Sequence, residues 1–136
     1  MSMFSAFDIA SSAMSAQAQR MNVTASNMAN ADSVAGPDGE TYRAKHVMFE
    51  TQAHNNRYGV GGVRVNEVVE DDSPLRLEYM PNHPAADEEG YVAKSNVEPV
   101  HEMVNMISAS RSYQANVEVF NTTKQMMVQT LSLGEG

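Results

Sequence analysis

Two long segments of the chain carry apolar residues at intervals of three and four, the spacing that places side chains on one face of an α-helix. The C-terminal segment, residues 100–131, contains neither glycine nor proline. Its apolar stripe consists of Met103, Met106, Ile107, Tyr113, Val117, Phe120, Met127 and Leu131, interrupted by Ser110 and Lys124. The pattern predicts one helix of roughly 33 residues, about 50 Å long at 1.5 Å per residue.

The ends of this helix are marked by residues that favour helix termini. Pro99 stands at the first helical position, where its missing N–H costs no hydrogen bond. Glu98 or Asn96 would cap the helix, and asparagine is the better capping residue of the two. Gly134 follows the last apolar stretch and is typical of a helix stop.

The N-terminal segment, residues 3–30, also lacks glycine and proline, and its apolar pattern has a period of seven. The repeated large residues are Phe7, Met14, Met21 and Met28, with the small residues Ser11, Ala18 and Ala25 four positions after the first three. This heptad pattern is typical of helices packed against other helices. The remaining face is polar but nearly uncharged, which leaves two interpretations: a weakly soluble surface helix, or a helix with neighbours on several sides. In the second case Asn22, Asn27 and Asn30 would form hydrogen bonds between helices.

The middle of the chain changes to a period of two, which predicts β-strands. A Gly-Pro-Asp-Gly turn at 36–39 separates it from the first helix. Strands are predicted at 42–49, 60–69, 75–79 and 91–94. The predicted fold is mainly α with a β insertion: an antiparallel coiled coil of residues 1–31 and 97–134, and a β-hairpin insertion at 32–96.

The insertion contains few large apolar residues, so we do not expect it to be stable apart from the helices or from partners. The two helices also have little apolar surface to bury against each other alone. We therefore predict that both ends of the isolated chain are partly disordered, and that lateral neighbours complete the burial.

The composition argues against several classes of partner and of binding site. With 17 acidic against 9 basic residues, the net charge is −8, which opposes binding to nucleic acid and to anionic membranes. There is no cysteine, and hence no disulfide or thiolate metal site. No apolar run is long enough to span a bilayer, and we expect no cleaved signal peptide because the first cation is Arg20.

We find no pattern of catalytic, cofactor-binding or metal-ligating residues. The four histidines, His46, His54, His83 and His101, lack the spacing of a helical metal site. The acidic groups at 70–72 and 87–89 fall in predicted turns and do not match a calcium-binding loop, so they are interpreted as solvated. The group Gly59, Gly61 and Gly62 lacks the lysine of a phosphate loop and is interpreted as a flexible part of a hairpin.

The two ends of the chain resemble the bacterial flagellar rod and hook proteins. The segment 12–33 is similar to the signature of that family, with Asn27-Met28-Ala29-Asn30 at its centre. The segments 41–52 and 96–134 resemble the short proximal rod members, and together the resemblance covers nearly the full chain. Glu98 departs from the aspartate expected before Pro99, which weakens the helix cap.

The resemblance implies a structural subunit of the flagellar basal body that is not an enzyme and needs no cofactor. Such proteins are exported unfolded by the flagellar type III apparatus without a cleaved signal, and assemble in the periplasm into a helical drive shaft. Terminal helices form the inner layer around the export channel, and the shaft transmits torque. The implied partners are the rod proteins FlgB, FlgF, FlgG and FliE, further copies of this chain and the export apparatus, with neither nucleic acid nor membrane insertion.

The expected assembly interface lies on the two terminal helices. Its residues are Phe7, Met14, Met21, Asn27, Met28, Asn30, Ile107, Tyr113, Val117, Phe120 and Met127. The apolar members would serve partly as ordinary core within one chain. Asn27 and Asn30 are assigned to hydrogen bonds between helices, with helix C-capping as the alternative. Other functions remain open: a cytosolic helical adaptor or secretion chaperone would suit the acidic charge, whereas an enzyme is disfavoured by the missing site chemistry.

Overall fold

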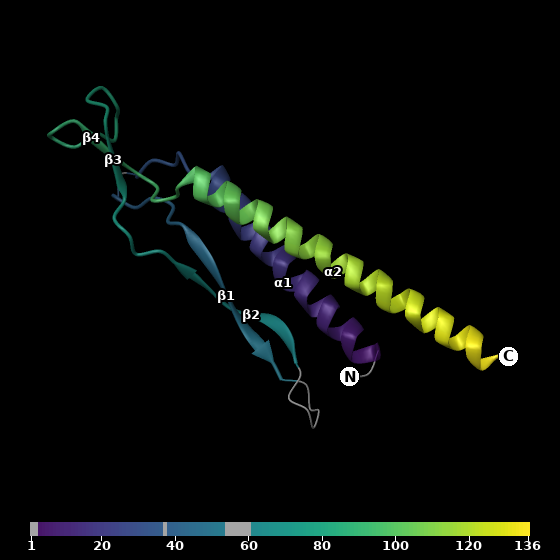
Figure 1. Cartoon of the computed structure of the whole chain (residues 1–136). Helices are drawn as coiled ribbons and strands as arrows, with labels where there is room; N and C mark the ends of the chain where they lie inside the picture. The colour runs from purple at the N-terminus through teal and green to yellow at the C-terminus, as the bar shows by residue number, and fades with distance from the viewer. Residues whose placement is uncertain (1–2, 37, 54–60) are drawn as a thin grey trace.

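A computed structural model describes residues 3–36, 38–53 and 61–136. The elements follow the order α1 (Met3–Ala29), β1 (Lys45–Gln52), β2 (Gly62–Glu70), β3 (Arg76–Tyr79), β4 (Tyr91–Lys94) and α2 (Pro99–Gly134). Two long helices therefore flank a β region in the described residues, as the sequence pattern predicts (Figure 1). Val60, which belongs to a predicted strand, lies outside the described residues.

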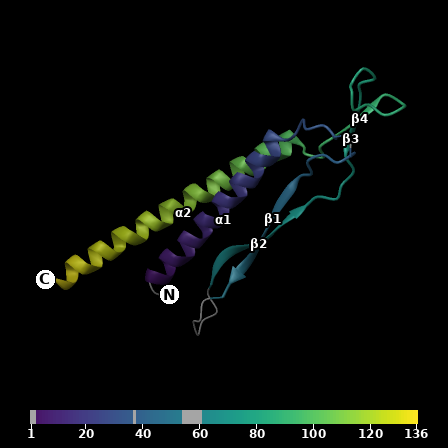
Figure 2. The same ribbon diagram turned by 180° about the vertical axis from the view of Figure 1, so that it is seen from behind.

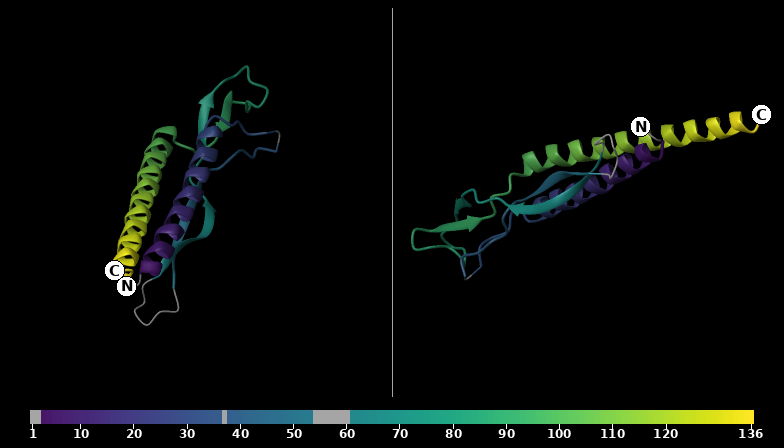
Figure 3. Two further views of the ribbon diagram at one scale, coloured as in Figure 1. Left: turned by 90° about the vertical axis from the view of Figure 1, so that its right-hand side faces the viewer. Right: turned by 90° about the horizontal axis from the view of Figure 1, so that it is seen from below.

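The two helices lie side by side and antiparallel, with both chain termini at the same end of the molecule (Figures 1 and 2). Helix α2 has 36 residues and α1 has 27, so α2 extends past the N-terminus of α1 (Figure 3). The end of α2 therefore has no helix of the same chain beside it.

The N-cap residue of α2 is Glu98, one of the two predicted, and not Asn96. Glu98 occupies the N-cap position but forms no capping hydrogen bond with its side chain. The Asn96 side chain instead accepts from the Ala44 N–H at 2.8 Å and donates to the carbonyl of Asp71 at 2.9 Å. Pro99 stands at the start of the helix, where its missing N–H costs no hydrogen bond.

The β region forms two separate antiparallel hairpins. Strand β1 pairs with β2, with a register shift between Met48 and Phe49, and β3 pairs with β4. The hairpin β1–β2 lies along α1, whereas β3–β4 lies beyond the end where α1 finishes and α2 begins (Figures 1 and 3). Each hairpin is too small to hold its own core, and packing on α1 supports the first of them.

Close approach of β2 to α1 explains two glycines. A side chain on Gly62 would overlap the Ser12 hydroxyl, and the Val63 N–H donates to the same oxygen at 3.1 Å. A side chain on Gly61 would overlap the backbone of Gln52. The interpretation of these two glycines as flexible elements is therefore wrong, because both are required by tight packing. Gly59 lies outside the described residues.

A small cluster of buried apolar residues lies where the helices meet the hairpins. It consists of Ala31, Ala44 and Val97, with Tyr42 packed against it. Arg76 ties this region together by donating to the carbonyls of Ala31 at 2.7 Å and Ser95 at 2.9 Å. The core thus joins segments that are distant in the sequence.

Candidate assembly interface

Helices α1 and α2 face each other along rows of residues spaced by seven. On α1 the rows are Phe7, Met14, Met21, Met28 and Ala10, Gln17, Thr24; on α2 they are Met106, Tyr113, Phe120, Met127 and Glu102, Ala109, Asn116, Thr123. All of these residues are buried or half-buried. Alternating steps of three and four on both helices are the spacing of a coiled coil.

Two contacts fix the pairing of the helices. The Phe7 and Phe120 rings meet edge to face, with centroids 4.6 Å apart. Between three and four turns further along α1, Arg20 donates to the Asn105 side-chain oxygen at 3.4 Å. Partner numbers fall on α2 as they rise on α1, which is the antiparallel arrangement. Edge-to-face ring pairs add to the free energy gained from burial alone.

The predicted stripe of α2 divides between two faces. Its half-buried members are Met106, Tyr113, Val117, Phe120 and Met127. Met103, Ile107 and Leu131 are largely exposed in the single chain, so α1 covers only part of the predicted stripe. The second α2 row was not predicted from the sequence, because three of its members, Glu102, Asn116 and Thr123, are polar. Their seven-residue spacing is the signal that would have located them.

Exposed apolar residues continue along α2 outside the contact with α1. Near its start they are Val100, Met103, Val104 and Ile107, and towards its end they are Val119, Met126, Val128, Leu131 and Leu133. Ile107 is 55% exposed and Leu133 is 82% exposed. An exposed apolar surface of this extent is typical of a protein that packs against others.

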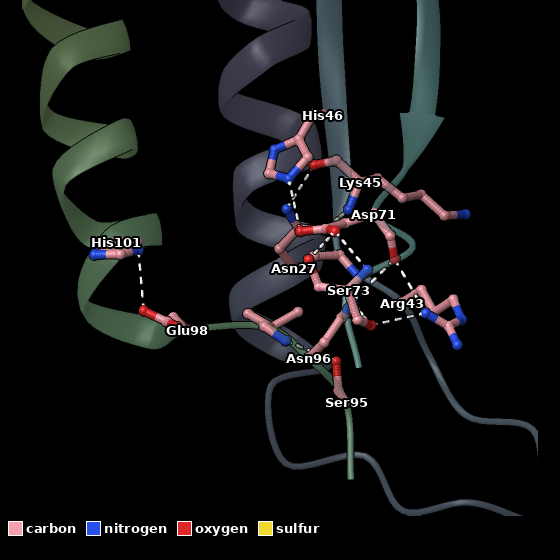
Figure 4. A network of polar contacts seen from close by, with 12 residues as sticks. Asn27, Arg43, Lys45, His46, Asp71, Ser73, Ser95, Asn96, Glu98 and His101 are labelled. Carbon is pink, nitrogen blue, oxygen red and sulfur yellow. Dashed lines mark hydrogen bonds and ion pairs between the residues drawn. The ribbon is translucent and has the colours of Figure 1, made fainter. Parts of the chain in front are cut away.

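Asn27 has a different role from the one expected. It is only 1% exposed, and its side-chain oxygen accepts from the Lys45 N–H at 3.0 Å and the Tyr42 hydroxyl at 2.8 Å. Its nitrogen donates to the Lys45 carbonyl at 2.8 Å. The predicted hydrogen bond to a neighbouring helix is therefore wrong: Asn27 attaches the end of α1 to the beginning of β1 (Figure 4).

Asn30 acts locally at the end of α1. Its side-chain nitrogen donates to the Ser26 carbonyl at 2.8 Å, and its oxygen accepts from the Ser33 hydroxyl at 3.3 Å. These contacts close the last turn of the helix. They agree with the alternative prediction that Asn30 caps the C-terminus of α1. The assignment of Asn30 to hydrogen bonds between helices of different subunits stays a prediction.

A polar network surrounds Asp71 beside this junction (Figure 4). The Asp71 carboxylate accepts from the hydroxyl and the backbone N–H of Ser73, and lies 3.5 Å from the His46 ring nitrogen. The bonds from Ser73 hold the pKa of Asp71 below its usual 3.8, and the His46 contact adds to the effect. Arg43 donates to the carbonyls of Asp71 and Ser73.

The acidic groups at 70–72 and 87–89 were predicted to be solvated, but two of their carboxylates form hydrogen bonds that stabilise turns. Besides Asp71, the Asp87 carboxylate accepts from the N–H groups of Glu89 and Tyr91 at 3.0 and 2.8 Å. Within residues 3–36, 38–53 and 61–136, no cluster of histidine and acidic residues is arranged to hold a metal ion. His54 lies outside these ranges. No helix in the same ranges is both long enough and apolar enough to cross a membrane.

The sequence matches two protein families over its two ends. Residues 7–37 match the family described as flagella basal body rod protein, and residues 88–133 match the flagellar basal body rod FlgEFG protein C-terminal family. These matches cover most of α1 with the turn after it, and nearly all of α2 with strand β4 before it.

Full-length relatives carry one shared description, flagellar basal-body rod protein FlgC. The protein of Yersinia enterocolitica is 59% identical over 135 residues, which is 99% of this chain and 100% of the relative. Those of Escherichia coli O157:H7 and Salmonella typhimurium are 57% and 56% identical with the same coverage. Neither the family matches nor these relatives support the alternative of an adaptor or secretion chaperone. The chain belongs to the FlgC family of flagellar basal-body rod proteins and is a structural subunit of that rod, not an enzyme.

Proposed function

We propose that this chain polymerises with other rod proteins into the proximal part of a helical drive shaft, which transmits torque and encloses the export channel. The observation that carries this proposal is the apolar surface of α2 that stays exposed in the single chain. Burial of such surface is the main favourable term in protein association. The family membership says that the partners of this surface are found in the flagellar basal body.

The geometry favours contacts between different surfaces over a symmetric dimer. Helix α1 covers one side of α2, and the exposed apolar residues lie on other sides and on the end beyond α1. One copy therefore has several different surfaces to offer. A surface that meets a different surface on the next copy continues as a helix unless the rotation closes.

The heptad rows also support an antiparallel coiled coil of α1 and α2 as the unit that assembles. In this proposal Phe7, Met14, Met21, Met28, Tyr113, Val117, Phe120 and Met127 pack within the chain and present their half-exposed edges to neighbours. Ile107 contacts neighbours only. Asn27 and Asn30 act on assembly indirectly, by fixing the end of α1.

The proposed partners are FlgB, FlgF, FlgG, FliE and further copies of this chain. The proposed route is export through the flagellar type III apparatus without a cleaved signal peptide, followed by assembly in the periplasm. The small apolar core supports this route, since a chain with little internal burial unfolds readily and completes its burial on assembly.

A substitution of one exposed residue tests the role of α2. In a strain lacking the gene, we expect Ile107→Glu to be expressed and exported but absent from isolated basal bodies, with loss of motility. Gln114→Glu is the matched control, because it adds the same charge at an exposed polar position of the same helix. Normal incorporation of Ile107→Glu would exclude Ile107 from the interface. Motility without the gene would refute the proposed function.

A further inference from the structure

The outer edge of strand β4 is covered by other segments of the same chain. There the Ala35 N–H donates to the Ala93 carbonyl at 2.9 Å, and the Asp87 N–H donates to the Tyr91 carbonyl at the same distance. The Tyr91 N–H donates in turn to the Asp87 carboxylate at 2.8 Å. These backbone groups of Tyr91 and Ala93 therefore point away from β3.

The outer edge of strand β3 is open. Leu77 lies opposite Ala93, and Tyr79 lies opposite Tyr91, in an antiparallel register. In such a pair, residues that bond across the ladder alternate with residues whose backbone groups point outward, and opposite residues share one state. The N–H and C=O groups of Leu77 and Tyr79 therefore point away from β4, where β3 has no further strand beside it within the described residues. An edge of this kind is a template for an added strand.

One face of the hairpin β3–β4 is apolar and exposed. Its side chains are Leu77, Tyr79 and Tyr91, which are 67%, 63% and 40% exposed. The two tyrosine rings meet edge to face, with centroids 5.4 Å apart. A strand added beside β3 places every second side chain on this face, so apolar side chains there would be buried against Leu77 and Tyr79. The hairpin lies beyond the paired helices (Figure 1).

The free charges near the open edge are negative. Three carboxylates flank the strands of the hairpin; they are exposed and form no hydrogen bond or ion pair within the described residues: Asp72, Glu88 and Glu89. The cations of the hairpin are already engaged. Lys94 pairs with Glu78 at 2.6 Å, and Arg76 donates to two backbone carbonyls. The edge therefore favours a partner with positive charges.

A strand from a second copy of this chain would bring no free cation to the edge. On β1 and β2, Lys45 pairs with Glu70 and Arg64 pairs with Glu50. Among the lysines and arginines of the described residues, the two that form no hydrogen bond or ion pair lie on α2, and they are Arg111 and Lys124. The charges thus favour a different protein as the partner.

We propose that an extended segment of another protein, in which basic residues alternate with apolar ones, adds to the open edge of β3 as a further strand. Its backbone bonds to the outward groups of Leu77 and Tyr79, its apolar side chains pack on the exposed face, and its basic side chains compensate the free carboxylates. Since β3 has only four residues, the backbone bonds are few and the charges supply much of the specificity. This inference goes beyond the proposed function, which concerns the surface of α2.

Amide hydrogen exchange of the full chain, measured with two short peptides, tests the added strand. One peptide alternates lysine with valine, and the other alternates glutamate with valine. The lysine peptide at saturation should slow exchange at Leu77 and Tyr79 by about tenfold or more, while Glu78, whose N–H already bonds to β4, changes little. The glutamate peptide should leave exchange at all three amides unchanged.

Two variants of Leu77 test the backbone contact. Leu77→Pro removes an outward N–H but no bond to β4, a position at which an edge strand tolerates proline. It should abolish the slowing at Tyr79. Leu77→Ala keeps the N–H and should retain the slowing. Protection of the Val92 amide in both variants checks that the hairpin still forms.

A triple variant tests the charges without touching the edge. Asp72→Asn with Glu88→Gln and Glu89→Gln should lower the affinity for the lysine peptide about tenfold, the order expected for three exposed charges. The matched control removes three exposed carboxylates distant from the hairpin and should bind like the wild type: Asp8→Asn, Glu118→Gln and Glu135→Gln.

The results that overturn the proposal are distinct. A lysine peptide that does not bind, or binds without slowing exchange at Leu77 and Tyr79, overturns the added strand. Equal binding of both peptides, or unchanged affinity of the triple variant, overturns the basic partner. Slowing at the two amides that grows with the concentration of the chain alone overturns the different protein and identifies a second copy. All of these measurements use the purified chain, so they are independent of whether it is found in basal bodies.

Discussion

The Asn27 side-chain amide both accepts a hydrogen bond from the backbone N–H of Lys45, at 3.0 Å, and donates one to the carbonyl of the same residue, at 2.8 Å. The pair joins the last turn of α1 to the first residue of β1, 18 positions later in the chain. Only a primary amide offers an acceptor and a donor side by side in this way. The asparagine at the centre of the family signature thus sets the angle between the helix and the hairpin.

Asn27→Asp should block rod assembly while leaving expression intact. The carboxylate has no donor for the Lys45 carbonyl and places a negative charge against it, at a cost of about 3 kcal/mol in the free energy of unfolding. Asn22→Asp is the control, because Asn22 is exposed on the same helix. Urea unfolding followed by circular dichroism, together with a motility assay, measures both effects. Wild-type motility of Asn27→Asp would contradict the prediction.

Gly62→Ala should destabilise the packing of β2 on α1. The added carbon would lie 3.0 Å from the Ser12 Cβ and closer still to its hydroxyl, so β2 must shift and the bond from Val63 weakens. Overpacking of this kind costs about 1–3 kcal/mol. Gly134→Ala is the control, since nothing lies within 4 Å of that position. Equal unfolding midpoints for the two variants would show that β2 does not pack here.

Acid should weaken the junction around Asp71. The pKa of this carboxyl is lowered in the folded chain, so its contribution to stability is present at neutral pH and is lost as the pH falls below about 4. Asp71→Asn should remove that part of the pH dependence. Asp72→Asn leaves the bonds from Ser73 in place and should behave like the wild type. Unfolding curves collected between pH 3 and 7 decide the point, and identical pH profiles for Asp71→Asn and the wild type would refute it.

Phe7 and Phe120 should be energetically coupled. Phe120→Ala is expected to lower the free energy of unfolding by about 2 kcal/mol. This is less than the loss for a fully buried ring, because the site is half-exposed. A cycle with Phe7→Ala should give a coupling of about 0.5–1.5 kcal/mol. Leu133→Ala, at an 82% exposed position, should cost less than about 0.5 kcal/mol. A coupling of zero would mean that the rings do not meet in solution.

Amide hydrogen exchange should distinguish the free chain from the assembled one. In the isolated chain we expect exchange to be fastest at the end of α2 beyond α1, and slower where α1 packs against α2 and against the hairpin β1–β2. Assembly should slow exchange in both helices, because neighbours then bury their exposed faces. Slow exchange throughout both helices of the isolated chain would show that the fold is self-sufficient.

The sequence alone was enough to place both helices and the β region, because helix and strand periods are local properties of the chain. It also located strand 91–94 with its bounds and the half-buried row of Phe7, Met14, Met21 and Met28. The family motif around Asn27 identified the rod proteins before any contact was known.

Only the tertiary structure decided what these residues touch. Asn27 bonds to Lys45 rather than to another helix, Gly62 makes room for Ser12, and Glu102 lies buried while Ile107 of the same helix stays exposed. Each of these facts depends on how segments distant in sequence approach one another, and helical spacing alone does not tell which of two apolar faces the partner helix covers. The physical reason is that local patterns fix periodicity, whereas packing between elements fixes burial and hydrogen-bond partners.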